Sequence, residues 1–246
     1  RAHASGHPDV AMAYGRLSVH PKTFLDEAIL TVFHRRPARN GRVPALKQPI
    51  FVPITRAIFR RSANSDRGKA QRWWVETFVS RFSGLTAFSR NQLLNTSVDV
   101  YANHDTTRTD ILHEYFVPPA HVGAFASGLR WIVRRHGADL MNVTVRNVYP
   151  DRDSFLRYAR EELFGFVILF NQPRTAEGDR AMAAMTRDLV DMVLGLGGTY
   201  YLPYRLHATR EQFRRAYPQA EAFFTLKRRY DPDELFQNQF YLTYGK

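Results

Sequence analysis

The chain has 246 residues, of which 44% are hydrophobic and 13% aromatic, so it can bury the core of one large domain or of two small ones. It has no cysteine, which excludes disulfides and thiolate metal sites and favours a reducing, cytoplasmic location. The formal net charge of +12 favours an anionic partner, although arginines scattered along a chain are also typical of a solvated basic surface.

The beginning of the chain carries no recognisable targeting segment. It starts at Arg1 and has no apolar run of the kind found in signal peptides or membrane spans. We therefore expect a fragment or a processed product whose native targeting signals are missing.

The N-terminal part alternates between extended and helical patterns. Residues 9–19 alternate apolar and polar side chains and predict a strand, and the TVFHRRP segment predicts a second extended stretch. Residues 37–50 are rich in Pro, Arg and Gly and predict a loop. Residues 51–94 predict helices with a break at Gly84, because apolar residues recur at helical spacing; these are Ile54, Ile58, Phe59, Trp73, Trp74, Phe78 and Phe82. We interpret residues 37–110 as a helical and loop insertion, with a polar loop at 95–110.

The central part predicts an α+β fold. Strands are expected at 111–117, 140–148, 164–170 and 199–206, and helices at 120–136, around 153–162 and at 176–194. Gly137 should end the first of these helices, and Asn171-Gln172-Pro173 should end the third strand. This order over 111–206 favours a ferredoxin-like sandwich, in which helices cover a mostly antiparallel sheet on one side. Residues 207–246 predict additional C-terminal helices, so the whole chain would form a single domain.

Several common site motifs are missing from the sequence. It contains neither GxxxxGK[ST] nor GxGxxG, and no serine nucleophile elbow. Gly195, Gly197 and Gly198 follow a predicted helix instead of opening one, which is typical of a C-cap. The nine histidines are scattered, and the adjacent His104 and Asp105 do not make a metal-ligand pattern, so we expect no metal site.

The basic, aromatic segment 69–82 allows two interpretations. It could contact an anionic membrane surface as an interfacial helix. Alternatively, its aromatic side chains could pack on the sheet or on another domain, which we favour. Trp73 and Trp74 are adjacent, so they cannot both face one side of a helix.

Residues 197–246 carry the most specific pattern in the chain. A glycine pair leads into a Tyr-rich extended run, and Thr209 opens a helix that breaks at Ala216-Tyr217-Pro218. The pattern closes with the basic cluster Lys227, Arg228 and Arg229, the turn Asp231-Pro232-Asp233 and the run Leu235-Phe236-Gln237-Asn238. Two earlier segments belong to the same pattern in order, EYFVP at 114–118 and NVTVR at 142–146.

This order resembles the C-terminal cap domain of FAD-linked oxidases of the vanillyl-alcohol-oxidase type, such as sugar-lactone, alditol and decaprenylphosphoryl-ribose oxidases. The resemblance covers residues 111–245 and, more loosely, the strand at 9–19, whereas 37–110 matches nothing in that family. It implies a substrate domain of an oxidoreductase that oxidises an alcohol or sugar-like CH–OH group of a small molecule by hydride transfer to FAD. The FAD would be held mainly by an N-terminal domain that is absent from this chain, so the chain alone should be inactive.

The resemblance also assigns roles to residues. It implies Tyr204 and Arg146 as catalytic residues. It implies substrate contacts from Asn142, Thr144, Tyr201, Arg205 and Asn171, and flavin contacts from Arg146, Lys227 and Asn238. Thr144 stands where the family tends to have Glu, and Tyr204 where the ribose oxidase has an essential Lys. Strand packing of the two tyrosines, or a surface ion pair of Arg146, would explain the same residues without a site.

Alternation with period two should place Asn142, Thr144 and Arg146 on one face of their strand. We expect the sheet face with Arg146, Tyr201, Tyr204 and Arg205 to be exposed, because it would meet the flavin of the missing domain.

A second function class remains open. A basic ferredoxin-like sheet with exposed aromatics can bind single-stranded nucleic acid or another anionic partner. The Lys/Arg-Gly-Phe/Tyr signature of RNA-binding sheets is missing, so we rank nucleic acid below the oxidase interpretation.

Overall fold

A computed structural model of the chain describes residues 9–35, 45–47, 51–81, 87–95 and 97–246. The predicted loop residues 37–44 and 48–50, the helix position Phe82 and the break at Gly84 lie outside the described residues. Within those ranges, no helix is both long and apolar enough to cross a membrane.

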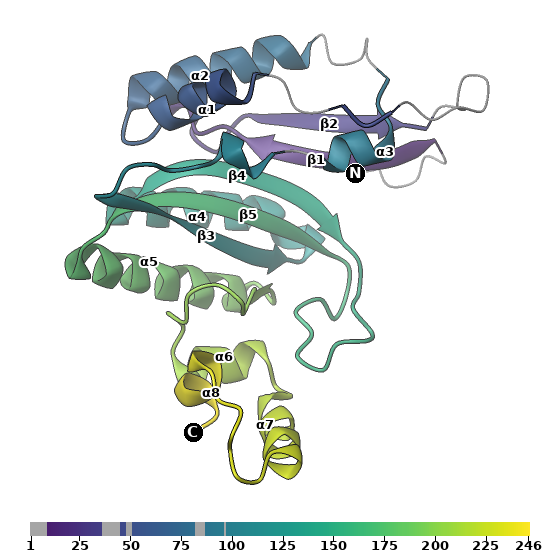
Figure 1. The fold of residues 1–246 in the computed structure, drawn as a ribbon, viewed down its shortest axis with the longest axis vertical. Helices are drawn as coiled ribbons and strands as arrows, with labels where there is room; N and C mark the ends of the chain where they lie inside the picture. Colours follow the sequence, from purple (N-terminus) through teal and green to yellow (C-terminus); the bar gives the residue numbers. More distant parts are fainter. Residues whose placement is uncertain (1–8, 36–44, 48–50, 82–86, 96) are drawn as a thin grey trace.

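The fold is α+β and is built on a six-stranded antiparallel sheet with the order β2-β1-β4-β5-β3-β6. The strands are β1 (Val10–Leu17), β2 (Ala28–His34), β3 (Arg108–Val117), β4 (Asp139–Val148), β5 (Leu163–Pro173) and β6 (Thr199–Tyr200). The long strands β4, β5 and β3 form the centre, and β1 and β2 extend the sheet beyond β4 (Figure 1). The predicted strand at 9–19 is thus part of the same sheet.

Two long helices cover one face of the sheet. They are α4 (Val122–His136) and α5 (Ala176–Gly195), and α4 lies behind the sheet in Figure 1. The chain order β3-α4-β4-β5-α5-β6 is that of a split β-α-β unit. The antiparallel α+β class is confirmed, while the ferredoxin-like name stays a prediction.

The main core fills the space between this sheet face and the two helices. Alternate residues of the strands supply Tyr115, Val143 and Phe166, and α4 supplies Phe125, whose ring centroid lies 4.7 Å from that of Phe166. Phe125 and Phe166 are fully buried. Burying each such side chain stabilises the fold by roughly 1.5–3 kcal/mol, so the paired strands and helices specify one another.

Short local signals set the ends of these helices, and α4 ends at Gly137 as predicted. The Thr175 hydroxyl accepts a hydrogen bond from the backbone N–H of Gly178 at the start of α5. Gly137 ends α4 in the left-handed region with φ 59°, a conformation that costs little only for glycine.

The N-terminal insertion forms a helical layer next to β1 and β2. It contains α1 (Val52–Arg61), α2 (Asp66–Ser80) and α3 (Arg90–Leu94). Arg72 of α2 joins the insertion to the sheet, because its guanidinium donates to the Met141 carbonyl oxygen at 2.6 Å and to Ser62 Oγ at 2.9 Å. Burial lowers the pKa of Arg72, and its ion pair with Glu76 opposes that shift.

The C-terminal helices form a narrower lobe below the sheet (Figure 1). They are α6 (Arg210–Ala216), α7 (Ala220–Tyr230) and α8 (Gln239–Tyr244). Phe213 is buried at the centre of this lobe against Tyr217, Phe224 and Tyr244. Thr209 opens α6 as predicted, through a capping box with Gln212. Short 3-10 turns complete the elements, at Pro21–Thr23 (η1), Val98–Val100 (η4) and Pro119–His121 (η5).

Three local predictions are wrong. No helix forms at 153–162, where the chain makes bends and turns. The Asp151 carboxylate instead accepts from the backbone N–H groups of Asp153 and Ser154, and such local bonds compete with helix formation. The strand predicted at 199–206 has only two residues, since Pro203 has no N–H to continue the ladder with β3.

The third error concerns the ends of two strands. β3 begins at Arg108, inside the predicted loop 95–110, and β5 continues through Asn171 and Gln172 to Pro173. The two extensions pair with each other, Arg108 opposite Pro173 and Thr109 opposite Gln172. Polar residues there remain in a strand because the partner strand is present, which local sequence patterns do not reveal.

Candidate functional site

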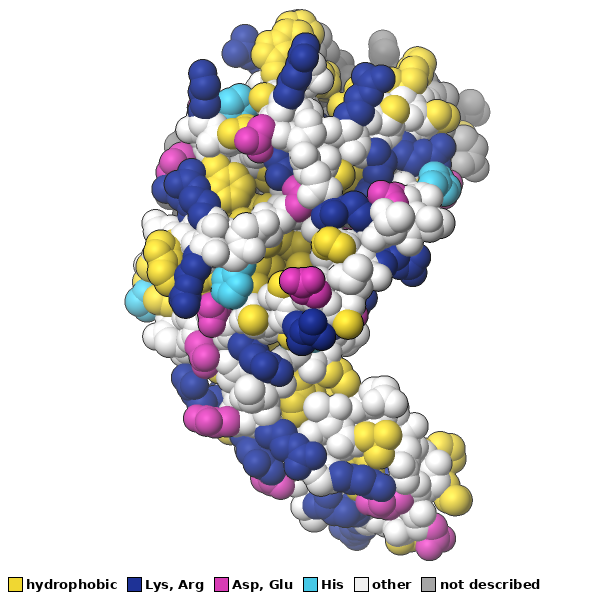
Figure 2. Space-filling view, turned by 90° about the vertical axis from the view of Figure 1, so that its left-hand side faces the viewer, with side chains coloured by type: hydrophobic (Ala, Val, Ile, Leu, Met, Phe, Trp, Pro, Cys, Tyr) yellow, Lys and Arg dark blue, Asp and Glu magenta, His cyan; other side chains and the backbone are white. Residues whose placement is uncertain are grey.

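The candidate site lies on the face of β4, β5 and β3 that α4 and α5 leave uncovered, which we call the open face. The strand register aligns the residues of this face across β4, β5 and β3. One row holds Thr144, Val167 and Glu114, and the next holds Arg146, Gly165 and Phe116. Figure 2 views the molecule from the left of Figure 1, and the open face lies on its concave right-hand side, between the N-terminal layer and the C-terminal lobe.

An ion pair between Arg146 and Glu114 forms the centre of the open face. An Nη of Arg146 donates to Glu114 Oε1 at 2.6 Å. The two residues come from β4 and β3, which β5 separates, so the arginine side chain spans the middle strand beside Gly165. The Arg146 side chain is 53% exposed whereas that of Glu114 is 6% exposed. The Glu114 carboxylate is therefore buried, whereas the Arg146 guanidinium is half-exposed to solvent.

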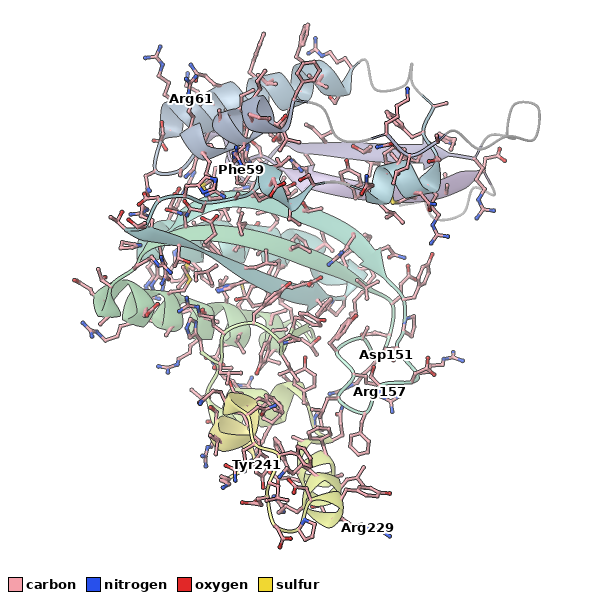
Figure 3. The ribbon with its side chains drawn as sticks, viewed as in Figure 1. Phe59, Arg61, Asp151, Arg157, Arg229 and Tyr241 are labelled. Atoms are coloured by element: carbon pink, nitrogen blue, oxygen red, sulfur yellow. The ribbon has the colours of Figure 1, made fainter. Side chains whose placement is uncertain are left out.

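A group of aromatic rings borders this ion pair. Tyr204 Oη donates to Glu114 Oε2 over a long 3.5 Å, and its ring lies edge-to-face on Tyr201 with centroids 5.3 Å apart. Tyr201 also meets Tyr158, which stacks on Phe116 at 4.2 Å. Tyr158 comes from the loop that follows β4, in which Asp151 and Arg157 are labelled in Figure 3.

The surroundings of Tyr204 fix its protonation state. Burial and then the Glu114 carboxylate raise the pKa of Tyr204 to about 12, since both disfavour the phenolate. Burial and then the neighbouring Tyr201 also raise the pKa of Tyr158. At neutral pH both residues carry a hydroxyl proton, and Tyr204 is the donor to the Glu114 carboxylate, which is the acceptor of the group.

Asn142 and Thr144 lie on the open face with Arg146, as alternation predicts. Asn142 Nδ2 donates to Thr144 Oγ1 at 3.1 Å, while Val143 between them is buried in the main core. The Oδ1 atom of Asn142 is buried and has no hydrogen-bond partner within the described part of the chain. An unsatisfied buried acceptor is costly, so the Asn142 amide is a position that the packing of this part of the chain leaves incompletely hydrogen-bonded.

The structure does not bring Arg205 to the ion pair. Its Nη1 lies 2.9 Å from Asp179 Oδ1 in the first turn of α5, on the helix-covered side of the sheet. Of the four residues expected on an exposed face, only Arg146 and Arg205 are exposed, and Tyr201 and Tyr204 are half-buried. The tyrosines are not covered by the insertion helices but pack on each other and on the loop after β4.

Asn171 lies at the other end of the sheet from Arg146. Its Nδ2 donates to Asp110 Oδ1 at 2.7 Å, and its Oδ1 accepts from Arg108 Nε. Asp110 in turn pairs with Arg60 of α1 at 2.6 Å. Asn171 is six positions from Gly165 in β5, which corresponds to about 20 Å along a strand. Asn171 thus connects the sheet to the insertion, and it cannot contact the same small ligand as Arg146.

Lys227 and Asn238 lie in the C-terminal lobe, away from the ion pair. Lys227 Nζ is 2.6 Å from Asp231 Oδ2 and 4.2 Å from the ring centre of Tyr241, which Figure 3 labels. Asn238 caps α8 by accepting from the Tyr241 N–H at 2.8 Å. Lys227, the turn and Asn238 therefore hold the lobe together, and a role toward a cofactor stays a prediction.

Glu114 and Tyr158 are the residues that the sequence did not assign to the site. The signal for Glu114 was present, because it is the charged residue in an otherwise apolar run of a strand, EYFV. Its partner could not be read from spacing, since Arg146 reaches it across a third strand. Tyr158 fell in the segment predicted as a helix, which concealed its position over Phe116.

No known family model matches the chain, and no curated protein sequence is similar to it. No group of three or more His, Asp and Glu side chains gathers in a metal-binding arrangement within the described ranges.

Proposed function

We propose that this chain is the substrate-binding cap domain of an FAD-dependent oxidoreductase that oxidises an alcohol or sugar-like CH–OH group. The observation that carries the proposal is the Arg146–Glu114 pair on the open face, bordered by tyrosines and left uncovered by helices. It lies in two of the segments that carry the family resemblance, 114–118 and 142–146. A flavin bound against this face would supply the hydride acceptor.

The residues present fit a flavin ring. A guanidinium has five N–H donors in a fixed plane, and the Glu114 contact uses only part of them. The remaining donors of the half-exposed Arg146 can point at a ring edge on which negative charge develops. Because Glu114 neutralises the guanidinium, Arg146 would act through directed hydrogen bonds instead of through a net positive charge.

The sequence has no recognisable loop for the phosphates of FAD. It has no glycine-rich loop that opens a helix, which is the usual way to cradle a pyrophosphate. We therefore propose that a separate FAD-binding domain holds the cofactor, in agreement with the resemblance.

Glu114 is the group best suited to take the proton of a substrate hydroxyl. Its carboxylate is held by Arg146 and approached by the Tyr204 hydroxyl, so a substrate hydroxyl that replaces the long Tyr204 contact would reach the same oxygen. Tyr204 remains a donor and would orient the substrate. Asn142 and Thr144 would contact its other hydroxyl groups.

Nucleic-acid binding has less support. The Tyr158 and Tyr201 rings are engaged with Phe116 and with each other, so they do not present free faces on which bases could stack. A steep decrease of oligonucleotide affinity with salt would instead favour that function.

The experiment is a Glu114→Gln substitution in the flavoprotein formed by this chain and its FAD-binding domain, with Glu161→Gln on an exposed loop as the matched control. Glutamine keeps the length and still accepts from Arg146, but it takes no proton. We expect the rate of reduction by substrate to decrease by about 10²–10⁴, with the control unchanged. An unchanged rate in Glu114→Gln would contradict the proposal.

A further inference from the structure

The hairpin of α1 and α2 has an outer surface that is unusually apolar for the surface of a protein. Trp74 is 65% exposed, Ile54 59%, Val79 57% and Phe78 47%. The Trp74 and Phe78 rings are stacked with centroids 5.5 Å apart. Large exposed apolar patches of this kind mark interaction surfaces.

The inner surface of the same hairpin is committed to the fold. Trp73 is buried and its Nε1 donates to Glu27 at 2.9 Å, while Lys69 pairs with Asp139 at 2.6 Å. Trp73 and Trp74 therefore point to different sides of α2, because adjacent helix positions are about 100° apart. Trp73 is packed inside the fold as expected, whereas Trp74 does not pack on the sheet, and its packing on another domain stays a prediction.

The two helices are joined closely enough to form a rigid platform. A Cβ atom on Gly68 would lie 1.9 Å from the Arg61 carbonyl oxygen, so only glycine allows the helices to approach this closely. The groove between them has a volume of about 470 Å³ and is lined by Ile58, Trp74 and Val75. Ile54, one turn before Ile58, and Phe78, one turn after Trp74, extend this apolar strip.

Basic side chains surround the strip. Arg61, Arg67 and Arg81 are exposed, and none of them has an ion-pair partner within 4 Å among the described residues. Figure 3 labels Arg61 at the upper end of the molecule, where Figure 2 shows hydrophobic side chains between Lys and Arg side chains. Residues 52–80 contain two acidic residues, of which Glu76 is bound to Arg16 and Arg72 on the inner side.

We propose that this outer surface docks the protein onto an anionic phospholipid membrane. Charge complementarity selects this occupant, since unpaired arginines match lipid phosphates and the acidic headgroups of such a surface. A stacked Trp and Phe beside arginines is the composition of an interfacial helix, in which the rings enter the headgroup region and the guanidinium groups remain outside. The hairpin lies at the top of the molecule, at the end opposite to the C-terminal lobe (Figure 1).

The test is co-sedimentation of the full chain with vesicles of phosphatidylcholine, with and without about one-third phosphatidylglycerol. Wild type should bind the anionic vesicles, and binding should fall when salt rises from about 0.1 M to about 0.5 M. Trp74→Ser/Phe78→Ser should weaken that binding at least about tenfold. The matched control is Trp131→Ser, because Trp131 is 60% exposed on α4, next to Arg135.

Several outcomes would overturn the proposal. These are no binding to anionic vesicles, equal binding to neutral ones, or equal loss of binding in the Trp131→Ser control. A change of sedimentation coefficient in the Trp74→Ser/Phe78→Ser variant without lipid would assign the surface to a second copy of the chain instead. Circular dichroism of both variants checks folding, and quenching of tryptophan emission by brominated lipid in wild type provides a measurement that does not depend on the variants.

Discussion

The buried histidine His113 should make the protein sensitive to acid. It lies on β3 under α5 and is 5% exposed. Its Nδ1 accepts from the Tyr115 hydroxyl at 3.1 Å, and its Nε2 lies 3.5 Å from Thr186 Oγ1. Thr186 donates its own proton to the Met182 carbonyl oxygen, so the network fits a neutral imidazole with the proton on Nε2.

The magnitude follows from the pKa of this imidazole. Burial, and then the neighbouring His207 and Arg205, lower the pKa of His113 from 6.5 to about 3. Above about pH 6.5 the group is neutral in both the folded and the unfolded chain and contributes no pH dependence. Between about pH 6.5 and about pH 3 only the unfolded chain binds the proton. The free energy of unfolding should therefore fall by about 1.4 kcal/mol per pH unit, or about 2 kcal/mol at pH 5.

The assay is urea unfolding at about pH 7 and about pH 5, for wild type and for His113→Leu/Tyr115→Phe. The double substitution removes the titrating group and the hydroxyl that would lose its acceptor. His207→Asn is the control. It removes the neighbouring histidine, whose pKa is also lowered, mainly by its partial burial. We expect wild type to lose about 2 kcal/mol more than the double variant over this range. Equal losses in the two proteins would refute the reasoning.

Two further predictions concern the C-terminal lobe and the cofactor. Thr209→Ala removes the capping box of α6 and should lower the free energy of unfolding by about 1 kcal/mol, as measured by urea unfolding, whereas Thr209→Ser should cost less. The isolated chain should not retain FAD after gel filtration, since it has no loop to hold the pyrophosphate; a stoichiometric flavin absorbance in the purified chain would contradict this.

The sequence predicts those parts of the fold that short-range signals determine. The helices α4 and α5 follow from apolar residues at helical spacing and from the glycines after them, Gly137 for α4 and the glycines from Gly195 for α5. The central strands follow from apolar runs such as 164–170. The errors have two causes. Polar Asn171 stays in β5 because it pairs with Asp110, a partner distant in the sequence. The predicted helix at 153–162 is replaced by local hydrogen bonds, in which the Asp151 carboxylate accepts from the N–H groups of Asp153 and Ser154.

The same limit applies to the candidate site. Period-two alternation places Thr144 and Arg146 on one face correctly, because it depends only on the strand itself. The partner of Arg146 depends on the strand order β4-β5-β3, which no local pattern contains. Arg205 illustrates the opposite case. Its place next to Tyr204 in the sequence suggests a shared site, but the strand ends at Tyr200 and the chain directs Arg205 to Asp179.

The most direct test of the proposed site compares the two arginines in anaerobic stopped-flow reduction of the flavoprotein by an alditol or sugar lactone that reduces wild type. Arg146→Met should slow reduction by about 10²–10³ while leaving FAD content near normal, because it removes directed donors from the open face. Arg205→Met should leave the rate unchanged, since Arg205 pairs with Asp179 on the other side of the sheet. Unchanged reduction in Arg146→Met, or equal slowing in both variants, would contradict the assignment of the Arg146–Glu114 pair to the site.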